Sequence, residues 1–320
     1  MTGGSAEQGG AAPVGSRERA LGIAYSLGAY VLWGVLPLYF LLLAPSGGWE
    51  VVAWRIVLAL VFCVLLLAVT RAWRRLVGIL RQPRLLALTA LAGVLIYVNW
   101  QTYVLATLSG HVVEASLGYF INPLVTILLG VLILRERLRP AQWGALALVV
   151  AAVAVIVIGY GAFPLIALTL AFSFGLYGLV KKRVGPAVDA VSGLTLESAW
   201  LAPVAIVQLA VVGATSGLTI FTAGAAHAVL LLLAGAITAV PLLMFASGAR
   251  RVPLTLVGML QFTTPIIQFA IGVWVLHEPM PPERWIGFAL VWAALAILTA
   301  DSVVASRRGR NSASDLAEPA

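Results

Sequence analysis

Three of the charged side chains in the long apolar runs of this sequence are candidates for chemistry. They are Arg55, Glu114 and Glu197. A charge at the centre of a helix in lipid costs about 2.5–3.5 kcal/mol on insertion scales, so such residues face a bundle interior or water. Arg55 lies roughly 7 Å into its run by helix rise, and Glu114 lies at a similar depth in another run. We therefore expect Arg55 and Glu114 to form an ion pair.

The carboxylates have both a structural and a functional interpretation. Glu197 enters its run from the opposite side of the membrane, within reach of Lys181, Lys182 or Arg251. A structural ion pair is the simpler interpretation for it. Proton coupling through Glu114 or His111 is the functional alternative, and His111 stands at the entrance of the same run as Glu114.

A second group combines amide donors and acceptors with aromatic rings inside apolar runs. Small-molecule pockets are mostly apolar with a few placed polar groups, and this group suits a neutral or weakly charged organic solute. The predicted solute-binding residues are Asn99, Trp100, Gln101, Tyr103, Tyr119, Asn122, Trp33, Tyr177, Gln261 and Gln268. The structural alternative for each of them is helix packing.

One ridge of small and polar residues repeats every four positions. Its members are Glu114, Gly118, Asn122, Thr126 and Gly130. Residues four apart share a helix face, and small residues let membrane helices pack closely. We expect this ridge to face other helices, as should its counterpart of Thr264, Gln268 and Gly272.

The composition excludes a soluble protein. Of 320 residues, 62% are apolar and 10% are charged, with a mean hydropathy of +1.03, whereas soluble domains are about half apolar and about a quarter charged. Each membrane crossing takes about 20 helical residues. The sequence lacks the alternating polarity of a β-barrel. The fold class is therefore predicted to be an all-α polytopic membrane protein.

Ten apolar runs define the predicted crossings. They cover residues 20–43, 51–70, 84–106, 113–134, 141–160, 163–180, 192–213, 227–248, 254–276 and 284–302. The first run is too long for the core of a signal peptide, so we expect it to be retained as a crossing. Residues 1–19 and 303–320 are polar and are predicted to be disordered cytoplasmic tails.

The distribution of basic residues predicts the orientation. Eighteen of the 20 lie on one side if the chain starts in the cytoplasm, namely Arg17, Arg19, Arg71, Arg74, Arg75, Arg81, Arg84, Arg135, Arg137, Arg139, Lys181, Lys182, Arg183, Arg250, Arg251, Arg307, Arg308 and Arg310. Arg284 falls in a loop on the other side. Because Lys and Arg concentrate in cytoplasmic loops, both termini should be cytoplasmic.

The sequence contains an internal duplication with one constant offset. AGVLIYVNW (92–100) aligns with AGAITAVPL (234–242), and Pro123, Glu136, Pro140 and Trp143 align with Pro265, Glu278, Pro282 and Trp285. Each copy holds five crossings, an odd number, so the second copy must run in the opposite sense. We predict two inverted five-helix repeats, over 20–160 and 163–302. Such repeats are typical of secondary transporters, whose substrate site lies between them; duplication without transport is the alternative.

Several stretches resemble a known family. VNWQTYVLATLSGHVVEASLGYFINPLVTILLGVLILRERLRPAQW (98–143), YVLWGVLPLYF (30–40), WEVVAWRIVLALVF (49–62) and LVGMLQFTTPIIQF (256–269) closely resemble the RarD branch of the drug/metabolite transporter superfamily, also called EamA-type permeases. The resemblance covers about residues 20–300. It implies ten helices in two EamA repeats, a location in the cytoplasmic (inner) membrane, and permeation of a solute, with export as the direction.

Sequence motifs for other functions are absent. There is no glycine-rich phosphate-binding loop with a lysine and no HExxH, and the only cysteine is Cys63. We therefore predict no enzymatic activity, no cofactor, no metal site and no nucleic-acid partner. The expected partners are a small-molecule solute and the lipid bilayer, and a homodimer is left open. A passive channel or a non-transporting membrane scaffold are the competing functions.

Overall fold

The fold is entirely helical over the part of the chain that the structure describes. The computed structural model describes residues 16–134, 138–161, 163–184, 187–249, 251–252 and 254–315. No strand occurs among them. The predicted fold class is confirmed, and the chain is an all-α multi-pass membrane protein.

Nine helical segments within the described residues are long and apolar enough to cross a membrane. They are α1 (Ser16–Leu42), α2 (Gly48–Thr70), α4 (Pro83–Leu108), α5 (Val112–Leu134), α6 (Pro140–Tyr160), α7 (Leu165–Val184), α8 (Ala190–Thr215), the consecutive pair α10 (Ala225–Leu232) and α11 (Ala234–Ala249), and α14 (Pro282–Asp315). Two short helices, α3 (Trp73–Leu80) and α9 (Thr219–Thr222), lie in connections.

The predicted ninth crossing is broken, which corrects the expectation of one continuous helix over 254–276. It consists of α12 (Leu254–Leu260), α13 (Thr263–Ala270) and the π-helix η2 (Ile271–Val275). Pro265 explains the first break, because it has no N–H for the carbonyl of Gln261 and its ring crowds that carbonyl. The Gln261 carbonyl instead accepts a hydrogen bond from the N–H of Thr264, three residues later, at 3.3 Å.

Helix α3 occupies the connection between α2 and α4, where the sequence predicts only an arginine-rich turn. Its Leu76 and Ile79 side chains are buried, whereas Arg74 and Arg75 are exposed. A helix with one apolar face and one basic face lies in the plane of a membrane interface. Here Leu76 and Ile79 pack with Leu67 of α2 and Leu85 of α4, so this apolar face fixes α3 to the end of the bundle.

The first and last helices extend beyond the predicted tail boundaries. Helix α1 begins at Ser16, and α14 continues to Asp315. The residues after 302 include Ala and Arg, which favour helix, so polarity alone does not end the helix. Outside the described residues lie 1–15, Arg135, Glu136, Arg137, Arg250 and 316–320, together with the surroundings of Gly130 and the side chains of Arg307, Arg308 and Arg310.

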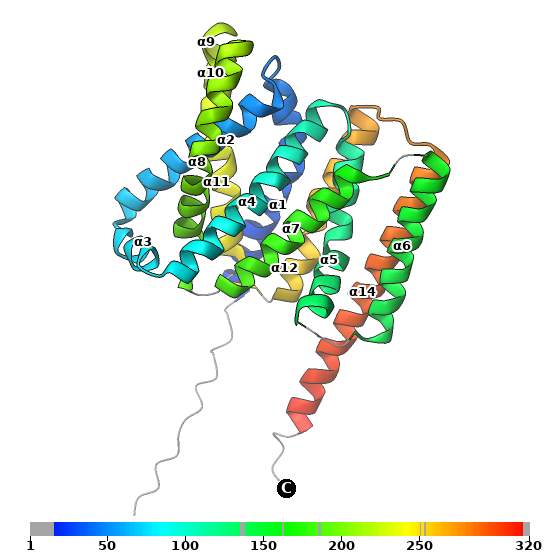
Figure 1. Cartoon of the computed structure of the whole chain (residues 1–320). Coiled ribbons are helices and arrows are strands. Elements are labelled where there is room, and N and C mark those ends of the chain that lie inside the picture. Colours follow the sequence, from blue (N-terminus) through cyan, green and yellow to red (C-terminus); the bar gives the residue numbers. More distant parts are fainter. Residues whose placement is uncertain are drawn as a thin grey trace, which may run out of the picture.

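The described basic residues gather at one end of the bundle. Helix α1 begins and α14 ends at this end, toward which α3 also lies (Figure 1). We call it the arginine-rich end; its described basic residues are Arg17, Arg19, Arg71, Arg74, Arg75, Arg81, Arg84, Arg139, Lys181, Lys182, Arg183 and Arg251. Arg284 lies at the start of α14, at what we call the opposite end.

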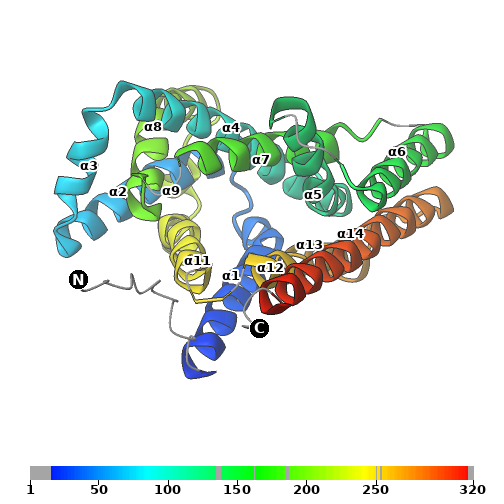
Figure 2. The same cartoon turned by 90° about the horizontal axis from the view of Figure 1, so that it is seen from below.

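The two halves pack in the same way. The predicted duplication relates the helices of the two halves in order, namely α1, α2, α4, α5 and α6 to α7, α8, α10–α11, α12–α13 and α14. In this correspondence, α1 packs on α11 and α13 of the second half, and α7 packs on the equivalent α4 and α5 of the first half. Helices α2 and α8 pack on each other, as do α6 and α14, which lie side by side at one edge (Figures 1 and 2). Helix α1 starts at the arginine-rich end and α7 at the opposite end (Figure 1).

Two equivalent glycines allow close packing between the halves. A Cβ atom on Gly235 of α11 would lie 2.5 Å from the carbonyl oxygen of Leu58 on α2, and one on Gly93 of α4 would lie 3.3 Å from the carbonyl oxygen of Glu197 on α8. The duplication aligns Gly93 with Gly235. Small residues thus bring backbones together at matching places in the two copies.

The apolar core has two main clusters. One cluster, around α1, α2 and α4, includes Phe40 and Ile56, and Tyr119 packs against it. The other, around α5, α6 and α14, includes Phe120 and Phe288. Consecutive residues of α5 therefore face different clusters, which places α5 at their boundary.

Candidate functional site

Arg55 projects from α2 into the junction of α1, α4 and α11. Its guanidinium carbon lies 4.4 Å from the ring centroid of Trp100 and 5.6 Å from that of Phe40. Its Nε atom donates a 2.8 Å hydrogen bond to Thr238 Oγ1, and the residue is 5% exposed. Aromatic faces attract a cation more strongly where water is excluded, so the fold surrounds this charge with ring faces.

The predicted ion pair between Arg55 and Glu114 is wrong. The ion pairs among the described residues do not include Arg55. Glu114, in the first turn of α5, accepts a 3.1 Å hydrogen bond from the backbone N–H of Ile166 in the first turn of α7. The first N–H groups of a helix lack partners within it and favour a carboxylate. The start of helix α7 therefore provides the hydrogen-bond donor for the Glu114 carboxylate.

A continuous row of aromatic rings runs across the bundle from beside the Arg55 guanidinium. The rings, in order, are Phe40, Tyr103, Tyr119, Phe174 and Tyr177, and neighbouring centroids lie 5.6–6.1 Å apart. The row leads from α1 through α4 and α5 to α7. Such rings provide a flat apolar wall, and the tyrosine hydroxyls add polar points along it.

Asn99 joins α4 to α5 and α7 at the middle of this row. Its Nδ2 atom donates to the Leu170 carbonyl and to Ser173 Oγ, both at 3.2 Å, and its Oδ1 atom accepts from the Tyr119 hydroxyl at 3.1 Å. The residue is buried. With both ends of its amide occupied, Asn99 orients the Tyr119 hydroxyl within the row.

Gln268 connects the broken ninth span to the same site. Its Nε2 atom donates to the Tyr103 hydroxyl at 2.8 Å and to the Trp33 carbonyl at 3.3 Å. Its Oε1 atom is buried without a hydrogen-bond partner among the described residues. One turn earlier, Thr264 donates to the Tyr30 carbonyl at 2.8 Å. These bonds hold α13 against α1 and α4.

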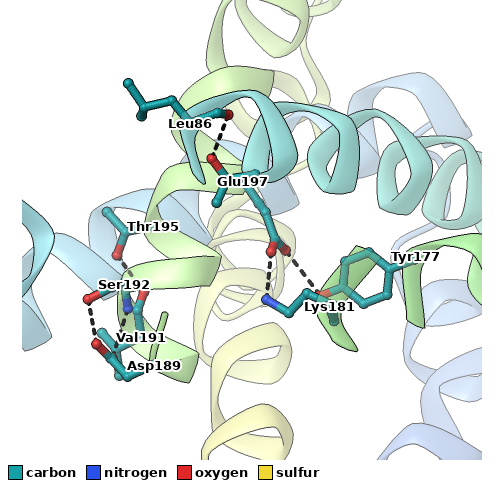
Figure 3. A network of polar contacts seen from close by, with 9 residues as sticks. Leu86, Tyr177, Lys181, Asp189, Val191, Ser192, Thr195 and Glu197 are labelled. Atoms are coloured by element: carbon teal, nitrogen blue, oxygen red, sulfur yellow. Dashed lines mark hydrogen bonds and ion pairs between the residues drawn. The ribbon is translucent and has the colours of Figure 1, made fainter. Parts of the chain in front are cut away.

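Glu197 forms a second buried charged group nearer the arginine-rich end. Its carboxylate pairs with Lys181 at 2.7 Å and accepts a 3.1 Å hydrogen bond from the Tyr177 hydroxyl (Figure 3). The Glu197 side chain is 2% exposed. A Cβ atom on Gly193 would lie 2.9 Å from Lys181 Nζ, so glycine leaves room for the pair. Lys181 is thus the basic residue that reaches Glu197.

Asp189 begins the helix that carries Glu197. Its carboxylate accepts hydrogen bonds from the backbone N–H of Ser192 at 3.1 Å and from the Ser192 hydroxyl at 2.7 Å (Figure 3). Partial burial alone would raise the pKa of Asp189, but these hydrogen bonds outweigh burial and lower that pKa below its usual range. A charged N-cap of this kind fixes the start of α8.

Three predicted residues lie apart from this cluster. Gln101 turns toward α2 and α8, where its Nε2 atom donates to the Gly48 carbonyl at 3.4 Å and its Oε1 atom accepts from Gln208 at 3.1 Å. Asn122 bonds within its own helix. Gln261 lies in the turn after α12 and has no side-chain hydrogen bond to the described residues. Successive helical residues point about 100° apart around the helix axis. Residues that are neighbours in the sequence therefore need not reach the same site.

Glu278 binds the start of α5 at the opposite end of the bundle. In the sequence it stands out only as part of the duplication. Glu278 accepts hydrogen bonds from the backbone N–H groups of Val112 at 2.6 Å and Val113 at 2.9 Å, the first two residues of α5. Burial raises the pKa of Glu278, and these hydrogen bonds offset part of that rise. The only sequence feature that singled out Glu278 is its alignment with Glu136 in the duplication.

A second polar group at the opposite end also escapes sequence reasoning. Glu50, 1% exposed, accepts a 2.8 Å hydrogen bond from the backbone N–H of Thr219. Ser46 Oγ lies 2.9 Å from His227 Nε2 and 2.6 Å from Thr219 Oγ1. The group ties the start of α2 to α9 and α10. An open groove of about 970 Å³ lies beside it between α2 and α8, and none of the predicted solute-binding residues lines it.

Comparison with known proteins decides the family. Residues 20–158 match the EamA-like transporter family. Protein RarD of Streptomyces exfoliatus is 49% identical over 92% of this chain and 92% of its own length. The chain belongs to the RarD family of the drug/metabolite transporter superfamily. Protein RarD of Escherichia coli is 37% identical over 92% of this chain and 98% of its own, and an uncharacterised transporter of Bacillus subtilis is 39% identical over the same shares.

A solved structure shares the fold of this RarD-family chain. A crystal structure of a protein covers 88% of the chain and 98% of its own chain, with a TM-score of 0.56 and 18% identity. At that identity the likeness concerns the fold alone. Membership in a family of membrane transporters implies the lipid bilayer and small solutes as partners.

Proposed function

We propose that this RarD-family chain is a secondary-active transporter, which moves a small organic metabolite or drug-like solute across the cytoplasmic membrane by alternating access. The row of five aromatic rings carries the proposal, because it has buried Arg55 at one end and buried Glu197 at the other. Both halves contribute to the site formed by the row and its polar neighbours. The first half supplies α1, α2, α4 and α5, and the second supplies α7, α8, α11 and α13. Secondary transporters bind their substrates at such a repeat interface.

The burial of the site supports alternating access over a channel. Trp100 is 8% exposed, Tyr103 is 3% exposed and Arg55 is 5% exposed, so a solute reaches them only when helices move. A passive channel would need a continuous pore with rings of like charge or a polar filter. Phe174, in the same row, is 37% exposed, so the buried part of the site is its Arg55 end.

The broken ninth span is the element that we propose to move. Interrupted helices line the binding sites of many secondary transporters, and π-helical turns often occur at functional sites. Here α13 supplies Gln268, and the break before it and η2 after it lie on both sides of this contact. Movement of α13 would open the site while the other contacts persist.

The predicted site residues take different parts in this proposal. We assign solute contact, or the orientation of contacting groups, to Trp33, Asn99, Trp100, Tyr103, Tyr119 and Gln268. Tyr177 and Glu197 form the far end of the path. Gln101 and Asn122 make their hydrogen bonds elsewhere in this conformation, and Gln261 makes no side-chain hydrogen bond to the described residues. A role for these three requires a second conformation.

The orientation follows from the basic residues. We propose that the arginine-rich end faces the cytoplasm and that both termini lie there. Export is the direction that the family resemblance favours. Transport without chemical change of the solute is proposed, since no catalytic motif appears in the sequence. Self-association into a homodimer stays a prediction.

Flux into liposomes tests the proposed function. Purified protein is first screened by thermal shift against metabolites and antibiotics, because a ligand of the folded state raises its apparent stability. A radiolabelled hit should then cross the membrane with saturable and competable kinetics. Linear, non-saturating flux would indicate a channel instead, and absence of flux would favour a scaffold. Unchanged gradient-driven uptake in Glu114→Gln would remove Glu114 from coupling.

A further inference from the structure

The charge of Arg55 has no carboxylate partner among the described residues. Its Nε atom is occupied by Thr238, but its Nη1 atom is shielded from solvent and has no hydrogen-bond partner there. A buried charge is costly unless it is paired, and an unmade hydrogen bond to a buried charged group adds to that cost. The ring faces of Trp100 and Phe40 offset only part of it.

Four glutamates of the described helices and loops are bonded to groups other than Arg55. Glu50, Glu114 and Glu278 accept hydrogen bonds from backbone N–H groups at the starts of helices, and Glu197 pairs with Lys181. Each glutamate is thus stabilised without Arg55. Among the described residues no carboxylate is therefore left for Arg55, and an anion from outside the chain would supply the missing partner.

The geometry around Arg55 fits a planar acidic group. A guanidinium that stacks on a ring keeps its N–H edge free, and that edge matches the two oxygens of a carboxylate. The row of rings begins beside it at Phe40 and Tyr103. Gln268 binds the Tyr103 hydroxyl through Nε2, and its Oε1 atom is a second buried polar atom without a partner among the described residues. This amide oxygen is an acceptor, which suits a hydrogen-bond donor on the solute.

We propose that Arg55 binds an acidic group of the transported solute, and hence that this transporter carries organic anions. The solute has a carboxylate or a similar planar anion on an apolar or aromatic body, which lies along the ring row. This inference rests on the proposed function and names the class of solute for that site. It replaces the sequence-based expectation of a neutral or weakly charged solute.

Thermal-shift measurements with matched acids and amides test the class of solute. The probes are benzoate, phenylacetate and cinnamate, each beside its carboxamide and beside chloride at the same ionic strength. The proteins are the unmodified chain, Arg55→Gln, Arg55→Lys and the control Arg139→Gln. The Arg139→Gln control also removes a positive charge, but from a side chain that is 44% exposed and pairs with Asp301.

At least one acid should raise Tm by several degrees in the unmodified chain and in Arg139→Gln, whereas its amide and chloride should not. Arg55→Gln should lose the shift. Arg55→Lys should keep part of it, since lysine keeps the charge without the planar fork. If Arg55→Gln does not fold, the comparison of acid with amide in the unmodified chain and in Arg55→Lys decides.

Four results would overturn the inference. They are equal shifts by amides and acids, a full shift with chloride alone, an acid shift that persists in Arg55→Gln, and no acid shift in the unmodified chain. Flux separates the two proposals. Saturable transport of a neutral solute without acid binding would leave the transporter and remove the organic-anion class. Acid binding at Arg55 without flux would keep the anion-binding site and overturn the proposed transport.

Discussion

Arg55 and Glu197 occupy equivalent positions in the two halves of the duplication and carry opposite charges. Arg55 lies near the start of α2 and Glu197 near the start of α8, and these two helices pack on each other. The same alignment relates Tyr39 to Lys181. Tyr39 donates to the Leu230 carbonyl at 2.8 Å, whereas Lys181 neutralises Glu197. The copies share the place of the charge, but only the second compensates it with an ion pair.

Removal of Lys181 should destabilise the protein. Lys181→Met leaves the buried Glu197 carboxylate with the Tyr177 hydroxyl as its remaining side-chain donor. Breaking a buried pair costs about 3–5 kcal/mol, and we expect about 2–3 kcal/mol because the Lys181 side chain is 32% exposed. Denaturant unfolding in detergent measures the change. The double variant with Glu197→Gln should recover most of it, and a double variant no more stable than the single one would contradict this account.

Replacement of Arg55 by an apolar residue should stabilise the solute-free protein. Arg55→Met removes a buried charge without a carboxylate partner, and it leaves Thr238 bonded to the Ala234 carbonyl at 2.8 Å. Apolar replacement of a buried ion pair is often neutral or stabilising by about 1–4 kcal/mol, and Arg55 lacks even the compensation of such a pair, while function suffers. We expect a higher Tm together with loss of flux. A lower Tm would mean that the cation–π contacts outweigh the burial of the charge.

The pH dependence of stability should report on Glu278. Its folded-state pKa is raised above the ordinary value of 4.5 by burial, so the folded protein binds a proton more readily than the unfolded chain. The resulting stability is fully present below that ordinary value and is lost as pH rises through the raised pKa. Glu278→Gln should flatten Tm against pH in this window. Glu283→Gln, which removes a carboxyl beside Gly159 instead, is the matched control for the loss of one carboxyl group.

Close packing of α5 on α7 makes Gly118 sensitive to substitution. A Cβ atom there would lie 2.6 Å from the Ala167 carbonyl oxygen and 3.0 Å from its Cα atom. Gly118→Ala should lower the free energy of unfolding by about 1–3 kcal/mol, as overpacking does. Gly144→Ala is the control, since nothing lies within 4 Å of its added Cβ atom. Equal effects of the two substitutions would show that helix propensity, and not contact, decides.

Thiol labelling of intact cells tests the orientation. Cys63 is 2% exposed and is first replaced by Ala. In that background, Thr222→Cys lies at the opposite end and Gly78→Cys lies on α3 at the arginine-rich end. A membrane-impermeant maleimide should label position 222 from outside and position 78 only after lysis. The reverse pattern would invert the proposed orientation.

Local pattern placed the spans along the chain, but it predicted neither the break within 254–276 nor the contacts between spans. Hydropathy places a residue along the membrane normal, and on that ground Arg55 and Glu114 stood at similar depth. Depth does not fix direction around a helix axis, so Glu114 points to the start of α7 and Arg55 to Trp100. The same limit separated Gln101 from the cluster that its sequence neighbours form.

The sequence by itself determined the membrane setting, the helical class, the duplication with its constant offset and the bias of basic residues to one end, because each depends on composition or spacing along one chain. Only the tertiary structure decided which polar groups meet. The partners of Arg55, Gln268 and Glu278 lie on helices far away in sequence, and the relative rotation of packed helices, which fixes those partners, arises from the fit of many side chains at once.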